Sequence, residues 1–148
     1  MVQSLRPRRN LAVARKLPTV PASWKQRNGS DAEYFCMIGL MQNGYREGGG
    51  AKGFTFQASL DGNKLRKKGD VIPDFLLNVP RLGINVQSRF YHSATADQRA
   101  QDIYARGIME SQGIRMAFIS EDQVRQNAKF WVGRAIAGFG SDPLGVLA

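Results

Sequence analysis

The sequence predicts an α/β fold, a mixed sheet of about four strands with helices on its faces. Segments with helical and strand-like apolar spacing follow one another in the order helix, three strands, helix, strand, helix. Strands joined by short turns pair antiparallel, whereas two strands joined through a helix run parallel by a right-handed crossover. The sheet is therefore expected to contain both kinds of pairing.

Three segments have the apolar spacing of amphipathic helices. The first, residues 30–44, begins with Ser30 and Glu33 at the spacing of a capping box and ends at Asn43-Gly44. Its apolar stripe consists of Ala32, Phe35, Cys36, Gly39 and Leu40. We expect this stripe to face the core.

The second predicted helix, residues 95–113, has Thr95 as cap and Gly113 as stop. Its apolar face carries Ala96, Ala100, Ile103, Tyr104, Gly107 and Ile108. The third, residues 121–139, opens with acids, which suit the positive end of a helix dipole. The residues expected to point inward from it are Val124, Ala128, Trp131, Val132 and Ala135.

Four short segments are typical of strands: residues 53–60, 71–77, 82–91 and 114–120. The stretch before the first of them, REGGGAK, is expected to be a flexible connection, and Asp61-Gly62 signals a hairpin after it. Four bases surround that hairpin, and they either contact phosphate or simply face solvent: Lys64, Arg66, Lys67 and Lys68.

The chain has 148 residues, of which 43% are apolar, and this suits one domain with one core. We expect an α/β domain at residues 29–140, a basic arm at residues 1–28 and a loose tail at residues 141–148. The arm has seven bases and no acid, whereas the rest of the chain has 14 bases and 12 acids. The seven bases are Arg6, Arg8, Arg9, Arg15, Lys16, Lys25 and Arg27.

A basic segment interrupted by prolines cannot bury enough surface to fold alone. Its charge predicts an interaction with DNA or with a nucleic-acid-bearing assembly, and such binding weakens strongly with salt. Two alternatives remain for residues 1–28: a solubilising tail, or an arm that wraps a neighbouring subunit.

The longest apolar run, Tyr34 to Met41, is shorter than the roughly 20 residues that cross a bilayer. No apolar segment typical of a secretory signal follows Arg9. We therefore expect no membrane association and a location in a host cytoplasm or in a virion. The single cysteine, Cys36, excludes an internal disulfide and is expected to be a buried, inert thiol.

Polar residues interrupt the second and third predicted strands. Asp74 lies in one of them, and Asn85 and Gln87 share a face of the other because side chains alternate along a strand. Polar groups in an apolar region need partners or a ligand, and a divalent cation such as Mg²⁺ is one ligand that accepts oxygen donors. Alternatively, Asp74 is an exposed turn acid after Pro73, and the two amides pair with neighbouring loops.

The motifs and their order resemble those of the PD-(D/E)XK nuclease superfamily, and locally those of the very short patch repair endonuclease type. Pro73-Asp74-Phe75 is similar to that family's strand motif, and INVQSRFYH, which ends in Phe90-Tyr91-His92, is similar to its second strand. Short motifs at residues 101–102, 113–115 and 119–121 resemble its helix and last strand. The resemblance covers residues 30–124 and rests on the order and spacing of these short motifs.

This resemblance implies a phage-type or resolvase-like DNA endonuclease that uses Mg²⁺ or Mn²⁺. Asp74 would be the principal metal-binding carboxylate, and Glu33 would be the acid that the first helix supplies. The very short patch type uses a backbone carbonyl in place of the second acid, and the carbonyl of Val86 would serve here. His92 would lie near the scissile phosphate and assist proton transfer.

The chain departs from the superfamily at the acid-x-lysine triplet, which is Asn85-Val86-Gln87, and it lacks the zinc-binding cysteines of the very short patch type. Two hypotheses follow. One is an active nuclease that uses Asp74, Glu33, Asn85, Gln87 and His92. The other is an inactive nuclease fold that serves as a nucleic-acid-bound structural subunit, with Glu33 as a capping residue and His92 as an ordinary surface residue.

Overall fold

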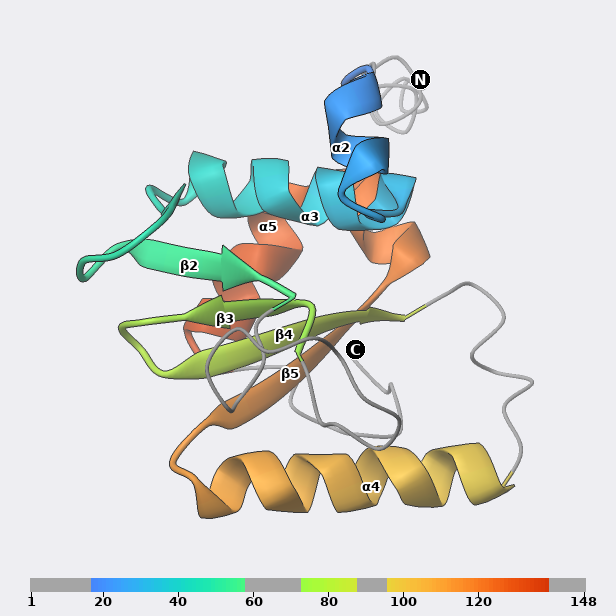
Figure 1. Ribbon diagram of the computed structural model, residues 1–148, viewed down its shortest axis with the longest axis vertical. Helices are drawn as coiled ribbons and strands as arrows, with labels where there is room; N and C mark the ends of the chain where they lie inside the picture. The colour runs from blue at the N-terminus through green and yellow to red at the C-terminus, as the bar shows by residue number, and fades with distance from the viewer. Residues whose placement is uncertain (1–16, 58–72, 88–95, 139–148) are drawn as a thin grey trace, which may run out of the picture.

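The computed structural model describes residues 17–57, 73–87 and 96–138. In chain order these form α2 (Ala22–Gln26), α3 (Asp31–Gln42), β1 (Arg46–Glu47), β2 (Gly53–Phe56), β3 (Phe75–Leu77), β4 (Leu82–Gln87), α4 (Ala96–Ser111), β5 (Arg115–Ser120) and α5 (Glu121–Ile136). Figure 1 shows α3 and α5 on one side of the sheet and α4 on the other. The predicted α/β architecture is confirmed.

The sheet is mixed, with the strand order β1-β2-β3-β4-β5. The strands β2, β3 and β4 pair antiparallel, and β4 pairs parallel with β5 from Leu82↔Arg115 to Gln87↔Ser120. The expected antiparallel pairing of β2, β3 and β4, and the parallel pairing of β4 with β5 across α4, are therefore confirmed. The strand β1 was not predicted. It is formed by the first two residues of REGGGAK, which was expected to be only a flexible connection, and it pairs parallel with β2.

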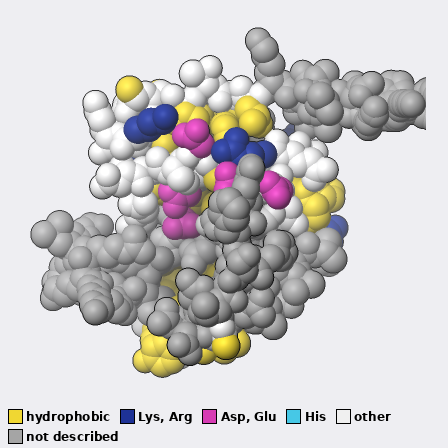
Figure 2. Space-filling model, turned by 90° about the vertical axis from the view of Figure 1, so that its right-hand side faces the viewer, with side chains coloured by type: hydrophobic (Ala, Val, Ile, Leu, Met, Phe, Trp, Pro, Cys, Tyr) yellow, Lys and Arg dark blue, Asp and Glu magenta, His cyan; other side chains and the backbone are white. Residues whose placement is uncertain are grey.

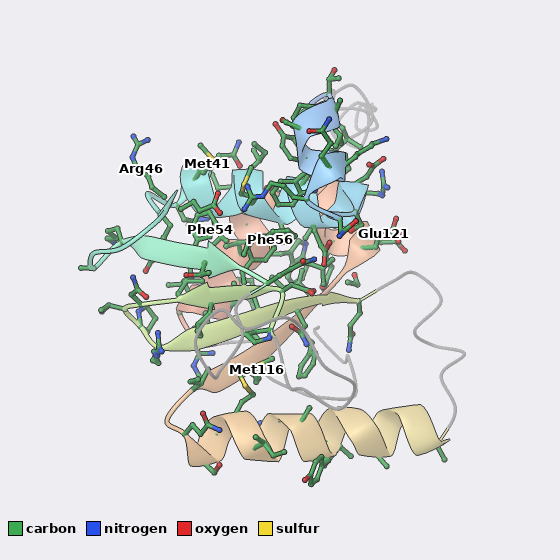
Figure 3. The ribbon with its side chains drawn as sticks, in the orientation of Figure 1. Met41, Arg46, Phe54, Phe56, Met116 and Glu121 are labelled. Atoms are coloured by element: carbon green, nitrogen blue, oxygen red, sulfur yellow. The ribbon has the colours of Figure 1, made fainter. Side chains whose placement is uncertain are left out.

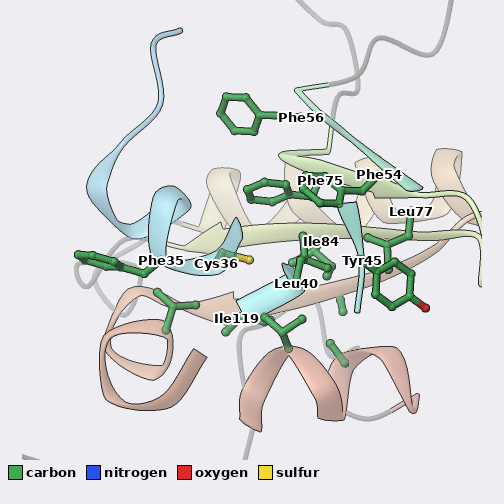
Figure 4. Close-up of a cluster of buried hydrophobic side chains, with 14 of the residues drawn as sticks. Phe35, Cys36, Leu40, Tyr45, Phe54, Phe56, Phe75, Leu77, Ile84 and Ile119 are labelled. Carbon is green, nitrogen blue, oxygen red and sulfur yellow. The ribbon is translucent and has the colours of Figure 1, made fainter. Parts of the chain in front are cut away.

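The main core lies between the sheet and the helices α3 and α5 (Figure 4). All five residues of the predicted α3 stripe are buried, and Ser30 and Glu33 form the predicted capping box. In α5, Val124, Val132 and Ala135 are buried, and Ala128 and Trp131 pack against the same core. The helical spacing in these two segments thus identified the buried faces correctly.

The helix α4 differs from the expectation for its apolar face. Ile103 is 51% exposed and Tyr104 is 70% exposed, and Ala96, Ala100 and Gly107 are exposed as well. Contact with the sheet comes instead from Met109, which is fully buried with Leu76, Met116 and Phe118 in a second, smaller cluster. The amphipathic spacing therefore identified a helix but not the face that it buries.

The end of the expected basic arm is part of the domain. Trp24 in α2 is 2% exposed, and its Nε1 donates a hydrogen bond to the carbonyl of Ser30. Arg27 forms an ion pair with Glu47, and its guanidinium lies 5.2 Å from the Trp24 ring. The expected boundary at residue 28 does not hold for residues 22–27, because burial of one large aromatic side chain fixes this turn of helix to the core.

Several predicted residues lie outside the described ranges. They are Arg6, Arg8, Arg9, Arg15, Lys16, Lys64, Arg66, Lys67, Lys68 and His92, together with the Asp61-Gly62 hairpin and the tail at 141–148. Within the described ranges, no helix is long and apolar enough to span a membrane.

Candidate functional site

The predicted polar residues meet at one end of the sheet. Asp74 immediately precedes β3, Gln87 is the last residue of β4, and Gln87 pairs in register with Ser120 at the end of β5. The helices α3 and α5 both begin at this end of the sheet (Figure 1). In open α/β sheets, ligands bind beyond the carboxyl ends of parallel strands, which is the position of this end of β4 and β5.

Asp74 is joined to β4 by two cross-strand hydrogen bonds, one with Asn85 and one with Val86. The backbone N–H of Asp74 donates to Oδ1 of Asn85 at 2.9 Å, and the backbone N–H of Val86 donates to Oδ2 of Asp74 at 2.8 Å. The last backbone pair of β3 and β4 at this end is Phe75↔Ile84. Just beyond it, the Asp74 carboxylate accepts the hydrogen bond that a backbone carbonyl of β3 would otherwise accept from Val86. Asp74 is half-buried, so the interpretation of it as an exposed turn acid is wrong.

The same hydrogen bond fixes the direction of the Val86 carbonyl. In an extended strand, the N–H and C=O of one residue point to the same neighbouring strand. Since the Val86 N–H points to Asp74, the Val86 carbonyl lies on the Asp74 side of β4. A carboxylate and a backbone carbonyl are therefore directed to the same edge of β4, as a site with oxygen ligands requires.

Gln87 lies two residues along the same strand face as Asn85. Gly83 lies on the same face of β4 as Asn85 and Gln87. A β-carbon added at Gly83 would meet Met116 and the α4 residue Met109, so this face is the α4 side of the sheet. The Nε2 atom of Gln87 is buried, and it has no hydrogen-bond partner within the described structure. A buried N–H donor without a partner is unfavourable by about 1–3 kcal/mol, so this amide is available to an acceptor oxygen of a ligand.

Replacing Gln87 by methionine is expected to raise the free energy of unfolding by about 1 kcal/mol, because a flexible apolar side chain of similar length removes the unsatisfied donor. Urea unfolding followed by circular dichroism measures this change. Asn85→Leu is the opposite control, since it removes the acceptor of the Asp74 N–H and should destabilise the protein. A destabilised Gln87→Met variant would show that the amide is already satisfied in the folded protein.

Glu33 lies in the first turn of α3, and its Oε1 accepts a hydrogen bond from the backbone N–H of Ser30 at 2.9 Å. The capping interpretation of Glu33 is therefore confirmed. Burial raises the pKa of the Cys36 thiol well above its usual value, and the negative charges of Asp74 and Glu33 raise it further. The charges of both acids thus act on one buried thiol.

The raised pKa of Cys36 predicts a loss of stability in alkali. In the unfolded chain this thiol ionises near pH 8.5, whereas in the folded protein it stays neutral to higher pH, so its contribution is complete below about pH 8.5 and is lost above it. The slope of unfolding free energy against pH should be less steep in Cys36→Ala, by up to about 1.4 kcal/mol per pH unit. Urea titrations of both proteins from neutral pH to about pH 10 test this. Parallel curves would contradict it.

Further charges gather at this end of the sheet. The first turns of α3 and α5 carry Asp31, Glu33, Glu121 and Asp122, and Figure 2 shows acidic side chains on this face beside Lys and Arg side chains. No group of three or more His, Cys, Asp or Glu residues placed to hold a metal ion occurs in the part of the chain that the structure describes. A metal here would rely on carbonyl and amide oxygens as well as carboxylates.

The sequence placed Arg27 among the bases of the arm, and the structure places it against the sheet. Its guanidinium lies 5.3 Å from the ring of Phe56, and the next residue, Gln57, donates its N–H to the backbone carbonyl of Asp74. The signal for this contact was the spacing of Trp24 and Arg27, which are three residues apart and share one face of a short helix.

The structure thus brings together Asp74, Asn85 and Val86, with Gln87 on the adjoining part of β4 and Glu33 close enough to act on the same thiol. Comparison of the chain with protein-family models, curated proteins and solved structures found no match.

Proposed function

We propose that this chain is a nucleic-acid-binding protein with a PD-(D/E)XK nuclease-like domain that hydrolyses phosphodiesters with Mg²⁺ or Mn²⁺. The observation that carries the proposal is the hydrogen bond between the Val86 N–H and the Asp74 carboxylate. It joins the two motifs to which the sequence resemblance assigns the metal site. It also directs a carbonyl and a carboxylate to the same side of β4, at one end of the sheet.

The topology supports the proposal. The elements α3, β2, β3, β4, α4 and β5 follow in the order that the resemblance implies, with the acid at the start of β3 and the degenerate triplet at the end of β4. Fold alone does not determine function, which depends on the side chains that meet at this end of the sheet.

The residues present fit a hard divalent cation. Mg²⁺ takes oxygen ligands, keeps several waters and is often held by only one or two carboxylates, and Asp74 with the Val86 carbonyl provides such a donor set. A carboxylate has about four acceptor positions, so the hydrogen bond from Val86 does not exclude a cation on the same group. A bound cation would supply an activated water and charge neutralisation at the phosphate.

The remaining groups of the chain bind and orient the substrate. The buried Nε2 of Gln87 donates to a non-bridging phosphate oxygen, which is the task that a lysine has in the intact triplet. The N-termini of α3 and α5 place partial positive charge at the same end of the sheet, which favours an anionic group there. Asn85 holds the start of β3 in place through its bond to the Asp74 N–H.

A second candidate is a nucleic-acid-bound structural subunit without catalysis, with the basic arm that precedes α2 anchored among neighbouring subunits. The specific observation in its favour is that Glu33 and Asn85, two of the expected catalytic residues, each make a hydrogen bond that stabilises the fold. Under this candidate, binding to DNA persists while the protein does not cleave it.

Binding to nucleic acid is tested with a fluorescent DNA duplex between about 50 mM and about 200 mM salt, where affinity for phosphates falls steeply. Exchange of the five bases Arg6, Arg8, Arg9, Arg15 and Lys16 for glutamine should flatten the slope of log affinity against log salt by about four. Exchange of Lys64, Arg66, Lys67 and Lys68 for glutamine tests the second group of candidate phosphate contacts in the same way: the slope flattens if these bases contact phosphate and stays unchanged if they face solvent. Affinity that is weak and independent of salt in the wild-type protein would contradict both candidates.

A further inference from the structure

A pocket of about 470 Å³ opens between α2, α3 and the β1–β2 edge of the sheet. Aromatic, methionine and arginine side chains line it, among them Trp24, Tyr34, Met37, Met41, Arg27 and Arg46. Figure 3 shows Met41 and Arg46 close together at the C-terminal end of α3. None of the residues assigned to the candidate functional site lines this pocket.

The walls combine flat rings with positive charge. The rings of Trp24 and Tyr34 are packed edge to face with centroids 5.5 Å apart, and Trp24 is held further by Phe56 at 4.4 Å. This packing keeps the Tyr34 ring in a fixed orientation while its side chain remains partly exposed. A rigid aromatic ring beside a guanidinium is a favourable surface for a nucleobase.

The charges select for an anion. The only acid in the lining, Glu47, is already paired with Arg27 in a two-pronged ion pair. Arg46 is exposed and has no acidic partner in the described part of the chain, so its charge is open to a ligand. Met37 and Met41 add flexible, polarisable surface, which adapts to flat ligands of different shape.

We propose that this pocket binds one unpaired nucleotide of a single-stranded nucleic acid, with its base against Tyr34 and Met37 and its phosphate on Arg46. This inference rests on the proposed function, according to which the protein binds nucleic acid. A paired base inside a duplex does not expose its ring faces, whereas a single strand does. The positive charge of Arg46 repels a basic peptide. The carboxylates of an acidic peptide would pair with Arg46 but would make no use of the rings of Trp24 and Tyr34.

The pocket is linked to the candidate site by a row of contacting aromatic rings. Phe56 contacts Trp24 on one side and Phe75 on the other, with centroids 5.1 Å apart in the second pair, and Phe75 directly follows Asp74. A nucleic-acid strand bound in the pocket therefore contacts the same part of the protein that positions Asp74. This arrangement makes the pocket a second contact for a strand bound at the candidate site.

The direct test is photochemical crosslinking of the full chain to a short oligothymidylate that contains one 5-iodouracil. The expected adducts, mapped by mass spectrometry, fall on Trp24, Tyr34 or the segment from Met37 to Met41. Adducts confined to other parts of the chain would overturn the proposal. Inclusion of a free mononucleotide distinguishes the sources: if it competes as well as the strand does, the pocket takes free nucleotide, and the assignment to a strand falls.

Two variants test the charge. Arg46→Ala should weaken binding of the single strand about tenfold, and Met41→Glu, which places an anion beside Arg46 on an exposed helix position, should weaken it at least as much. Arg81→Ala is the matched control, since Arg81 is an exposed arginine in the β3–β4 turn, outside the pocket. Equal effects at Arg46 and Arg81 would refute the pocket. Duplex binding that stays salt-dependent in all variants would leave the proposed function standing.

Discussion

Gly39→Val is expected to destabilise the protein by more than about 3 kcal/mol and to leave it largely unfolded in mild urea. A β-carbon added at Gly39 would lie 2.8 Å from the backbone oxygen of Ala128 and 2.9 Å from its β-carbon. The helices α3 and α5 meet closely at this point, and the obstacle is largely backbone, so neither helix can yield without separating from the core. Urea unfolding followed by circular dichroism and tryptophan fluorescence measures the loss.

Gly39→Ala and Gly107→Ala form a matched pair that isolates the packing effect. Both glycines lie inside helices, where alanine is favoured over glycine by about 1 kcal/mol. No atom lies within 4 Å of a β-carbon added at Gly107, so Gly107→Ala should stabilise the protein, whereas Gly39→Ala should destabilise it by about 1–2 kcal/mol. Equal stabilisation by both substitutions would show that α3 and α5 are not in close contact at Gly39.

Asp74→Asn is expected to weaken Mn²⁺ binding more than about 100-fold while it leaves the fold intact. Asparagine can still accept the hydrogen bond from the Val86 N–H, so the connection between β3 and β4 is preserved. What is lost is the negative charge, and attraction between two unit charges about 4 Å apart is roughly 4 kcal/mol near a protein surface. Titration calorimetry of the wild-type and variant proteins measures the change.

Asn85→Asp is the matched variant with the opposite expectation. An aspartate at this position can still accept the hydrogen bond from the Asp74 N–H, and it restores the acid that the triplet lacks. Mn²⁺ should bind at least about tenfold more tightly than to the wild-type protein, because a second charge then faces the cation. If neither Asp74→Asn nor Asn85→Asp altered the affinity, any bound Mn²⁺ would lie elsewhere.

The helices of the main core were predictable because their sequence periodicity and their burial agree. Every residue of the stripe from Ala32 to Leu40 is buried, and the capping box at Ser30 and Glu33 defines where α3 begins. The apolar face of α4 failed as a guide to burial. Periodicity shows that a helix has an apolar face, but only the tertiary structure decides which residues, here Met109, meet the sheet.

Two elements near the pocket could not be predicted from local signals. The strand β1 has only two residues, Arg46 and Glu47, too few to show alternation, and it exists because β2 offers an open edge. The helix α2 lies in a basic, proline-containing stretch, and a single large side chain, Trp24, attaches it to the core. Burial of one aromatic residue outweighed the composition of the surrounding segment.

In the candidate site, the proximity of Asp74 and Asn85 followed from strand alternation and a short turn, and the structure has the two residues hydrogen-bonded. The roles of individual atoms were beyond the sequence. Because β3 begins only at Phe75, the carboxylate of Asp74 accepts a hydrogen bond from the backbone N–H of Val86. The Nε2 atom of Gln87 is buried without a hydrogen-bond partner among the described residues. Such details depend on where a strand stops, which is the least predictable feature of a sheet.

Incubation of purified full-length protein with supercoiled, linear and branched DNA in Mg²⁺ or Mn²⁺ tests the central claim most directly, with Asp74→Asn and a chelator as parallel controls. The account predicts nicked or cut products that require the metal, disappear in Asp74→Asn and increase in Asn85→Asp. Absence of cleavage by the wild-type and Asn85→Asp proteins, with DNA binding intact, would contradict the hydrolytic function and leave a nuclease-like domain that only binds nucleic acid.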